Sequence, residues 1–490
     1  MTRSLELSCA LGVDLGTSAI KVVALSRNGR ILATARESYE TVSTRAGQAE
    51  QDCTHWLKAL SRAVTSVHKQ RTRKLHVEAI GLTGQMPTLV VLNRGKLSGR
   101  AITWQDSRAD DWTSERLNPR VRQDVYRRTG IIIDGRYLAP MYGFHRRRRS
   151  RRDVILSAKD FLLYALTGTA ATDPSTASGY ALYNLQTGAW DKKLCNFWNI
   201  SAEQLPSIKP SSSSLRLCSD GSKWVGCAPG TPVFVGCADS AAGVYGLSGT
   251  AANDAVMILT GSSTVIIKSD SRPHWDPESR YLVTPLALDH TYGREADLLA
   301  SGSARGWLQN LFAANDSKAQ RLLWQRAREI SPGAQGLLFA PYLAGGEQGV
   351  LWNPELNGML HGLTSAHTQA HIARALFEGM AFEIRRCIEV LENQPLAFVR
   401  ITGWMAENAA ESQILADVLG RSVHACKLDS ASATGAALLT GFVQEKMYFS
   451  RLTSLAFAPR SKNTRLYDEV YARYIACFPA NHCRVDGATR

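Results

Sequence analysis

Short apolar runs separated by turns of small residues open the chain. The mostly apolar runs Ala10–Val13 and Ala19–Leu25 predict two strands, and Asn28-Gly29 before a third run is typical of a hairpin. Apolar residues then recur at helical spacing from Glu50 to His68, and a buried strand is expected at Val77–Leu82. Strands that alternate with helices in this way predict a layered α/β fold.

The second half begins with a similar pattern. It predicts a strand at Ala255–Leu259, a turn at Thr260–Thr264 and a returning strand at Val265–Lys268. The first turn centres near Gly16 and the second near Gly261, so they are 245 residues apart (261 − 16), half of the 490-residue chain. This symmetry suggests a duplicated fold with a cleft between the halves. Chance is the alternative, because short turns of Gly, Ser and Thr are common.

We expect the boundary between the halves near Gly246–Asp254, so residues 1–249 would form an N-terminal domain and residues 250–490 a C-terminal one. The Ser-, Pro- and Gly-rich stretch at 206–232 predicts a surface loop. Further helices are expected at Thr368–Leu391, Asn408–Leu419 and Thr464–Phe478.

Composition narrows the class of protein. Hydrophobic residues make up 44% of the chain and charged residues 20%, which suits packed cores and excludes disorder as the main state. No run of about 18 apolar residues predicts a membrane helix, and the N-terminus lacks the apolar core of a secretory signal. The ten cysteines form no CxxC pair or Cys/His cluster. We therefore expect a cytoplasmic protein with reduced thiols and no membrane partner.

The net charge of +14 depends largely on one segment. Six arginines lie between His145 and Asp153, at 146–149, 151 and 152, and without them the balance is +8 (14 − 6). Such a run can bind phosphates, so a nucleic-acid partner has to be considered. No aromatic residues are interleaved with the arginines, which favours a solvated surface segment, and nucleic acid is not expected as a partner.

The segment Asp14-Leu15-Gly16-Thr17-Ser18 is the most informative cluster of the first half. An acidic residue at a strand end can hold Mg²⁺, while Gly16 and the hydroxyls of Thr17 and Ser18 can bind phosphate oxygens. The alternative is a plain β-turn that uses Asp and Gly for geometry. The turn at Gly261-Ser262-Ser263-Thr264 offers hydroxyls for a second phosphate, as a weaker signal.

Two further aspartates are candidates for chemistry. Asp239 stands between a strand and a small-residue helix start, where it can cap the helix or act as a general base in the cleft. Asp106, in Trp104-Gln105-Asp106-Ser107-Arg108, can bind sugar hydroxyls or cap a helix that begins at Ser107. The residues alone leave both pairs of alternatives open.

Several segments match one known family over nearly the whole chain. They are Gly12–Ser18, Gly84-Gln85-Met86, Trp104–Arg108, Lys159–Leu162, Leu166-Thr167-Gly168, Thr172-Asp173, Ala177-Ser178-Gly179, Pro341-Tyr342-Leu343 and Leu415–Gly420. The most specific match is Gly358-Met359-Leu360-His361-Gly362-Leu363, followed by His371-Ile372 and Ala375–Glu378. With these segments the chain resembles the FGGY carbohydrate kinases, and most closely the xylulokinases among them.

The resemblance implies two ribonuclease H-like, actin-like domains that close over ATP, Mg²⁺ and a sugar. It places Asp239 on the family's general base and Asp14 on the Mg²⁺-associated carboxylate. The implied sugar-binding residues are Gln85, Met86, Pro87, Asp106 and Ser240. The implied ATP- and phosphate-binding residues are Gly16, Thr17, Ser18, Gly261, Ser262, Ser263, Gly403, Trp404 and Glu407. The expected reaction is phosphoryl transfer from ATP to a ketopentose such as xylulose, and a homodimer is a common arrangement in the family.

The chain departs from the family pattern at several of these positions. Pro87 and Thr88 stand where xylulokinases usually have His and Gly, and Ser240 replaces an asparagine. Trp404 and Met405 replace two glycines, and their bulk is expected to narrow the nucleotide pocket. Two alternatives therefore stay open, namely a kinase for another polyol or sugar acid, and a catalytically impaired sugar-binding sensor.

Overall fold

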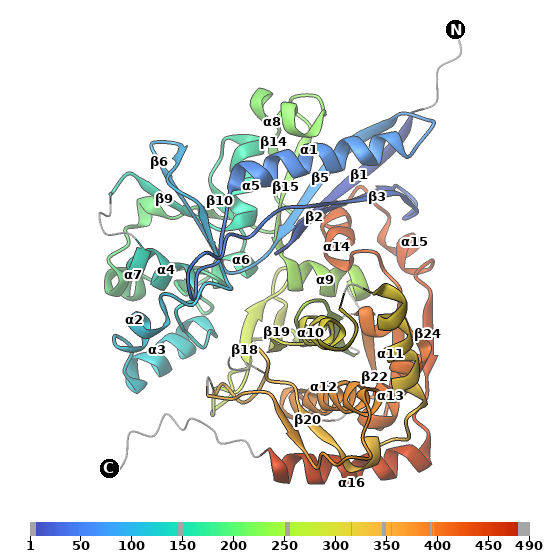
Figure 1. Cartoon of the computed structure of the whole chain (residues 1–490). Coiled ribbons are helices and arrows are strands. Elements are labelled where there is room, and N and C mark those ends of the chain that lie inside the picture. Colours follow the sequence, from blue (N-terminus) through green and yellow to red (C-terminus); the bar gives the residue numbers. More distant parts are fainter. Residues whose placement is uncertain are drawn as a thin grey trace.

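The computed structural model describes residues 6–145, 150–249, 255–314, 316–344, 349–353, 355–392, 394 and 396–478. Two large sheets, one in each half of the chain, organise the fold (Figure 1). The first sheet has the order β14 (Ser214–Arg216), β15 (Pro232–Ala238), β5 (Leu75–Gly84), β1 (Leu7–Leu15), β2 (Ala19–Ser26) and β3 (Ile31–Ser38). The second has the order β18 (Leu282–Pro285), β19 (Tyr292–Leu298), β17 (Thr264–Asp270), β16 (Val256–Thr260), β22 (Phe398–Gly403), β23 (Ser422–Cys426) and β24 (Ser454–Phe457).

The two sheets share one internal arrangement. In the first, β1 pairs antiparallel with β2 and parallel with β5, and β15 lies parallel beyond β5. In the second, β16 pairs antiparallel with β17 and parallel with β22, and β23 lies parallel beyond β22. The strand–turn–strand units predicted near Gly16 and Gly261 are thus confirmed, and they occupy equivalent places in the two sheets.

Helices cover the sheets where the sequence has apolar faces. Helix α1 (Cys53–Lys69) packs on β2 and β3 through residues such as Trp56 and Leu60, both fully buried. It begins three residues later than predicted, because Glu50–Gln51 forms the short strand β4 and the Asp52 side chain accepts the Thr54 N–H as an N-cap. Helix α12 (Gln369–Leu391), predicted at 368–391, is buried along most of its length.

Helices α9 (Asp239–Ser248) and α14 (Ala431–Leu439) lie between the sheets and pack tightly on each other (Figure 1). A Cβ atom added at Gly435 would lie 1.9 Å from the Ala242 carbonyl oxygen, so only glycine permits this approach. Helix α14 also packs on β1, so the C-terminal half contacts the first sheet directly. The boundary at 249/250 adjoins residues 250–254, which lie outside the described residues, and it stays a prediction.

The segment predicted as a loop at 206–232 contains regular structure. It holds β13 (Ser207–Ile208), β14 and α8 (Ser219–Val225). The last helix, α16 (Ser461–Cys477), begins three residues before the predicted start. The loop prediction failed because small residues here end short elements: the Cys218 side chain caps the start of α8 and Gly226 follows its end.

The predictions from composition can be followed only in part. The nine cysteines in the described ranges are all free. Within those ranges no helix has both the length and the apolar character needed to cross a membrane. Of the arginine run, residues 146–149 lie outside the described part, and Arg151 and Arg152 form an exposed turn before β9 (Asp153–Leu156). Its role stays a prediction.

Candidate active site

The carboxyl ends of three parallel strands bring the candidate residues together. In the first sheet β5 lies between β1 and β15, and Asp14 on β1 and Cys237 on β15 are both in register with Thr83 on β5. Asp14, Gln85 and Asp239 therefore emerge at the same edge of the sheet. Ligands of open α/β sheets bind at this edge, so the register alone builds a site from residues far apart in sequence.

Asp14 is 3% exposed and holds one oxygen ready for a ligand. Its Oδ2 lies 3.4 Å from Lys21 Nζ and 3.5 Å from Ser430 Oγ, whereas its Oδ1 is buried without a hydrogen-bond partner. The described residues contain no group of three His, Cys, Asp or Glu side chains arranged as a metal cage. Mg²⁺ is commonly held by one or two carboxylates together with nucleotide phosphates, so the Asp14 donor fits an ion that arrives with ATP.

Asp239 is the first residue of α9 and directly follows β15. Its Oδ1 accepts the Ser240 N–H at 2.9 Å. Burial, and next the charge of Asp14, raise the pKa of Asp239 to about 7. A carboxyl with a pKa near neutrality can take a proton from a substrate hydroxyl, which is the property required of a general base.

Hydrogen bonds fix the first turn and leave its two hydroxyl groups available to a ligand. The Gly16 N–H donates to the Ala19 carbonyl, and Tyr39 donates its hydroxyl proton to the Gly16 carbonyl. Trp104 Nε1 donates to Thr17 Oγ1 at 3.0 Å. Because the Thr17 oxygen accepts this bond, its own proton is available for an acceptor such as a phosphate oxygen. Ser18 is exposed beside it.

Hydrogen bonds to residues at the start of the next helix fix the second turn, between β16 and β17. Gly261 and Ser262 are exposed, while the Ser262 carbonyl accepts the Ser303 N–H at 3.0 Å at the start of α10 (Gly302–Ala313). Thr264 Oγ1 donates to Ser301 Oγ at 2.7 Å below it. The exposed atoms of Gly261, Ser262 and Ser263 thus form a second candidate phosphate loop.

Gly403 and Trp404 border the second sheet at the end of β22. Gly403 has φ 87°, and a Cβ atom there would lie 1.9 Å from the Thr260 carbonyl oxygen, so the position requires glycine. The Trp404 ring is partly buried, with the Arg305 guanidinium 4.9 Å from its centroid. Met405 is fully buried in the core, so the expectation that both side chains narrow the pocket is corrected: only Trp404 can do so. Glu407 is exposed.

Gln85 presents a free acceptor on the sugar side. The side chain is 1% exposed, and its Nε2 donates to Gln51 Oε1 at 3.0 Å. Trp56 Nε1 fixes Gln51 through a bond of the same length. Gln85 Oε1 is buried without a partner, which suits a substrate hydroxyl. Met86 and Pro87 follow it at the strand end and are partly exposed.

The Asp106 carboxylate is engaged by groups of the protein itself. Its Oδ2 accepts the Ala49 N–H at 2.9 Å and pairs with the Arg108 guanidinium at 2.6 Å, and Arg108 also pairs with Glu50 at 2.7 Å. Burial opposes ionisation, but the His145 ring, whose Nε2 lies 3.7 Å from Asp106 Oδ1, and the hydrogen bonds from Arg108 lower the pKa of Asp106. The next helix, α2 (Asp110–Ser114), begins three residues after the predicted start, so Asp106 does not cap it. Contact of Asp106 with a sugar stays a prediction.

Glu295 is a site residue that sequence reasoning missed. It lies on β19 of the second sheet, is 5% exposed and accepts the Thr284 hydroxyl at 2.6 Å. Burial raises the pKa of Glu295, against hydrogen bonds from Thr284 and Ser240, and its charge contributes to the raised pKa of Asp239. Glu295 therefore faces the candidate base from the opposite half. No local pattern signals this, because Asp239 and Ser240 belong to α9, which follows the strands of the other half of the chain.

A second missed feature is a buried chain of contacts behind Asp239. Lys159 Nζ lies 3.0 Å from Asp160 Oδ1 and 3.2 Å from Asp173 Oδ1, and all three side chains are fully buried. Asp173 accepts the Ser175 hydroxyl, and Ser175 Oγ accepts the Ala238 N–H at 2.9 Å. The chain ends one residue before Asp239 and so fixes the peptide that carries it. The Lys159–Leu162 and Thr172-Asp173 motifs were the only signal in the sequence.

The chain is similar to known proteins over most of its length. The N-terminal domain model of the FGGY family of carbohydrate kinases matches residues 9–246, and the C-terminal domain model matches 256–443. A xylulose kinase of Staphylococcus epidermidis is 27% identical over 96% of each chain. A gluconokinase of Bacillus licheniformis is 26% identical over 88% of this chain and 87% of its own. A glycerol kinase of Rhodopirellula baltica is 26% identical over 94% of this chain and 88% of its own.

Solved structures share the fold. A gluconate kinase from Lactobacillus acidophilus superposes with a TM-score of 0.87 at 24% identity, over 97% of this chain and 98% of its own. The glycerol kinase of Plasmodium falciparum with ADP superposes with a TM-score of 0.82 at 20% identity, over 96% and 98%. These likenesses confirm the predicted two-domain actin-like α/β fold. Because the two family models follow each other along the chain and together match most of it, this chain belongs to the FGGY family of carbohydrate kinases.

Proposed function

We propose that this sugar kinase transfers the terminal phosphoryl group of ATP to a hydroxyl of a ketopentose such as xylulose, with Asp239 as the general base. The observation that carries the proposal is the pKa of Asp239, raised to about 7 beside Asp14 at one strand edge. Asp239 takes the proton of the attacking hydroxyl, and the hydroxyl oxygen then bonds to phosphorus as ADP leaves.

Each remaining residue has a role in positioning. Thr17, Ser18 and the Gly261–Ser263 turn bind phosphate oxygens, and Gly403, Trp404 and Glu407 border the nucleoside. Asp14 holds Mg²⁺, which neutralises charge on the phosphates when it is bound. Gln85 Oε1 accepts a sugar hydroxyl, with Met86, Pro87, Asp106 and Ser240 around it. Closure of the two halves excludes water, so that ATP is not hydrolysed in place of transfer.

The cleft favours a neutral acceptor. Asp14, Asp239 and Glu295 place three carboxyl groups near the reacting hydroxyl, and Lys21 is the cation that offsets them. A sugar acid would add a further negative charge to this environment. The xylulose kinases among the relatives support a ketopentose as the acceptor. Because a gluconokinase and a glycerol kinase are similar to this chain at about the same identity, gluconate and glycerol must be tested as well.

A sugar-binding sensor is the second candidate function, favoured by the Trp404 ring at the nucleotide side. Retention of Asp14, Thr17 and Asp239 at the strand edge favours the kinase. As an ATP user with free thiols the protein is assigned to the cytoplasm, and a homodimer stays a prediction.

The test is ADP release with ATP and Mg²⁺ over a panel of D-xylulose, L-xylulose, D-ribulose, L-ribulose, glycerol, gluconate and erythritol. Calorimetry of ATP binding accompanies it. The proposal predicts ATP binding and turnover that is highest with a pentulose. Turnover highest with gluconate would overturn the substrate assignment, and sugar binding without ATP binding would establish the sensor.

A further inference from the structure

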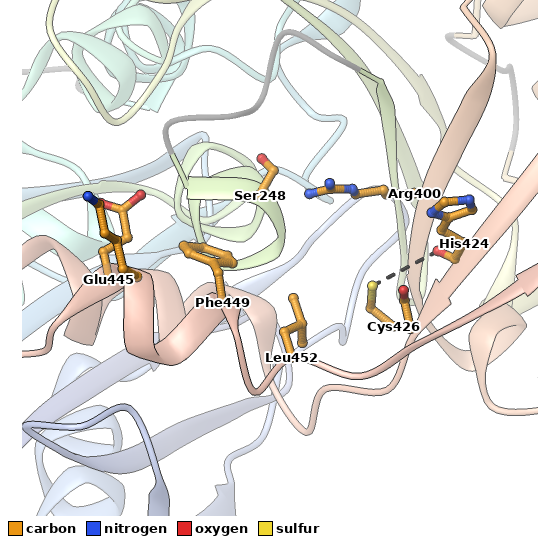
Figure 2. A pocket seen from close by; sticks show the side chains of 9 residues that line it. Ser248, Arg400, His424, Cys426, Glu445, Phe449 and Leu452 are labelled. Atoms are coloured by element: carbon orange, nitrogen blue, oxygen red, sulfur yellow. Dashed lines mark hydrogen bonds between the residues drawn. The ribbon is translucent and has the colours of Figure 1, made fainter.

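A cavity of about 310 Å³ lies outside the candidate active site and shares no lining residue with it. It opens between the second sheet, the end of α9 and the short helix α15 (Glu445–Phe449) (Figure 2). Its lining includes Ser248, Arg400, His424, Lys446, Phe449 and Leu452. Neither the proposed reaction nor the family match gives these residues a role.

Strand register places two basic side chains side by side in this lining. Arg400 on β22 is directly opposite His424 on the parallel strand β23, so both side chains project from the same face of the sheet. Cys426, two residues along, lies on that face as well, opposite Ser454 on β24. Figure 2 shows Arg400 extending over the cavity towards Ser248.

The charge of this cluster is not balanced within the lining. In the described part of the chain no carboxylate forms an ion pair with Arg400, whose guanidinium lies 5.7 Å from the Phe398 ring centroid. Glu445, the carboxylate of the lining, accepts the Tyr245 hydroxyl at 3.0 Å. Burial, and next the charge of Arg400, lower the pKa of His424. Lys446 on α15 adds a second full positive charge to the lining, against the single negative charge of Glu445, so the lining is net positive and suits an anion.

Part of the cavity wall is apolar. Phe449 and Leu452 lie between Glu445 on α15 and the basic pair Arg400 and His424, as Figure 2 shows. A bare inorganic anion would leave this wall uncovered. A ligand with a charged head and a flat or apolar body would contact both the basic pair and the apolar wall.

The cavity also joins the two halves of the molecule. Helix α15 is tied to the first sheet, because the Gln444 N–H donates to the Arg27 carbonyl at 2.8 Å in the turn after β2. Arg400 and His424 belong to the second sheet. A ligand that contacts both sides would stabilise one arrangement of the halves over others.

We propose that this cavity is a binding site for a small phosphate monoester, whose phosphate lies between Arg400, His424 and Lys446 and whose body packs on Phe449 and Leu452. Occupation of the site couples to the movement of the two halves and so regulates the cleft. This inference goes beyond the proposed reaction and does not depend on it.

The test is calorimetric titration of the full chain with phenyl phosphate, which has an aromatic body and is neither a sugar nor a nucleotide. Arg400→Gln and His424→Gln are each expected to weaken binding at least tenfold, and Arg465→Gln, which changes an exposed arginine of α16, is the matched control. Thr17→Val reports on phosphate that enters the active-site cleft and is expected to leave this binding unchanged. Inorganic phosphate is expected to bind more weakly than phenyl phosphate.

Equal binding by wild type, Arg400→Gln and His424→Gln would overturn the site. Loss of binding in Thr17→Val would assign the ligand to the cleft, and inorganic phosphate that binds as tightly as phenyl phosphate would overturn the role of the apolar wall. Circular dichroism checks that each variant folds, and Lys446→Gln, at an exposed position, replaces a variant that does not. Because the titration needs no turnover, its outcome is separate from that of the proposed reaction. Regulation itself predicts a changed sugar KM with phenyl phosphate in wild type and an unchanged one in Arg400→Gln.

Discussion

The carboxylate of Asp14 raises the pKa of Asp239, although Asp14 lies on β1, Asp239 directly follows β15, and these two strands do not pair with each other. Their strands, β1 and β15, flank β5 on opposite sides, and the common register brings both carboxyl groups to one edge. Asp14, the carboxylate proposed to bind Mg²⁺, and Asp239, the proposed base, are therefore coupled electrostatically. Any change that removes negative charge near Asp239 should make it a stronger acid and a weaker base.

The first prediction concerns pH. Asp239 must be ionised to accept a proton, and its pKa is about 7, so kcat/KM should rise as pH increases through 7. Below that pH the rate should fall about tenfold for each pH unit, because the fraction of ionised base falls by that factor. A pH profile of sugar-dependent ADP release measures this. A rate that stays flat between pH 5.5 and 8 would contradict the assignment of Asp239.

Glu295→Gln tests the influence of the opposite half on the base. The amide keeps the size of the side chain and can still accept the Thr284 hydroxyl, but it removes the charge that raises the pKa of Asp239. The apparent pKa of the acid limb of the pH profile should therefore fall by about half a unit. Glu115→Gln, which removes the charge of an exposed carboxylate at the end of α2, is the control and should leave the limb where it is. A limb that is unchanged in Glu295→Gln would show that Glu295 does not act on the base.

Lys159→Met tests the buried chain that fixes Asp239. The substitution leaves Asp160 and Asp173 as buried carboxylates without their cation, which should cost about 3–5 kcal/mol of unfolding free energy. The Asp173–Ser175–Ala238 contacts should loosen, so kcat should fall more than the sugar KM rises. Denaturant unfolding and steady-state kinetics measure both effects. Lys192→Met, at an exposed position of α7 (Lys192–Trp198), should change neither, and equal stability of the two variants would refute the structural role.

Gly403→Ala tests the close approach at the nucleotide side. A methyl group at φ 87° and 1.9 Å from the Thr260 carbonyl oxygen must displace the end of β22. We expect the KM for ATP to rise at least tenfold while the sugar KM changes little, with a loss of stability of about 1–3 kcal/mol. Gly441→Ala is the control, since that glycine also has positive φ but has open space around it. Equal ATP KM values in the two variants would remove Gly403 from the nucleotide site.

Local patterns predicted much of the fold. The turns near Gly16 and Gly261 were predictable because a hairpin is encoded by a few adjacent residues, and the structure has both at the expected places. The ends of elements were less predictable. The apolar spacing places the start of the first helix at Glu50, whereas the Asp52 side chain caps α1 so that it begins at Cys53. The Ser- and Gly-rich stretch at 206–232 has the composition of a loop but contains a strand in the main sheet.

Only those site residues that follow directly on a predicted strand could be found from the sequence. Asp14, Gln85 and Asp239 each end a recognisable apolar run, so their meeting at one edge follows from the sheet. The role of Glu295 could not be predicted, because its partners Thr284 and Ser240 and its effect on Asp239 depend on how the two halves face each other. The burial of Met405 likewise depends on the core of the second half and not on its neighbours in sequence.

The role of Asp239 as general base is tested most directly by comparing Asp239→Asn with Asp220→Asn, which changes an exposed aspartate of α8. Sugar-dependent ADP release is measured at pH 8 with saturating ATP and Mg²⁺, and ATP binding is measured by calorimetry on the same samples. We expect Asp239→Asn to bind ATP as wild type does but to lose about a thousandfold or more in kcat, while Asp220→Asn retains full activity. Turnover by Asp239→Asn within about tenfold of wild type would show that Asp239 is not the general base.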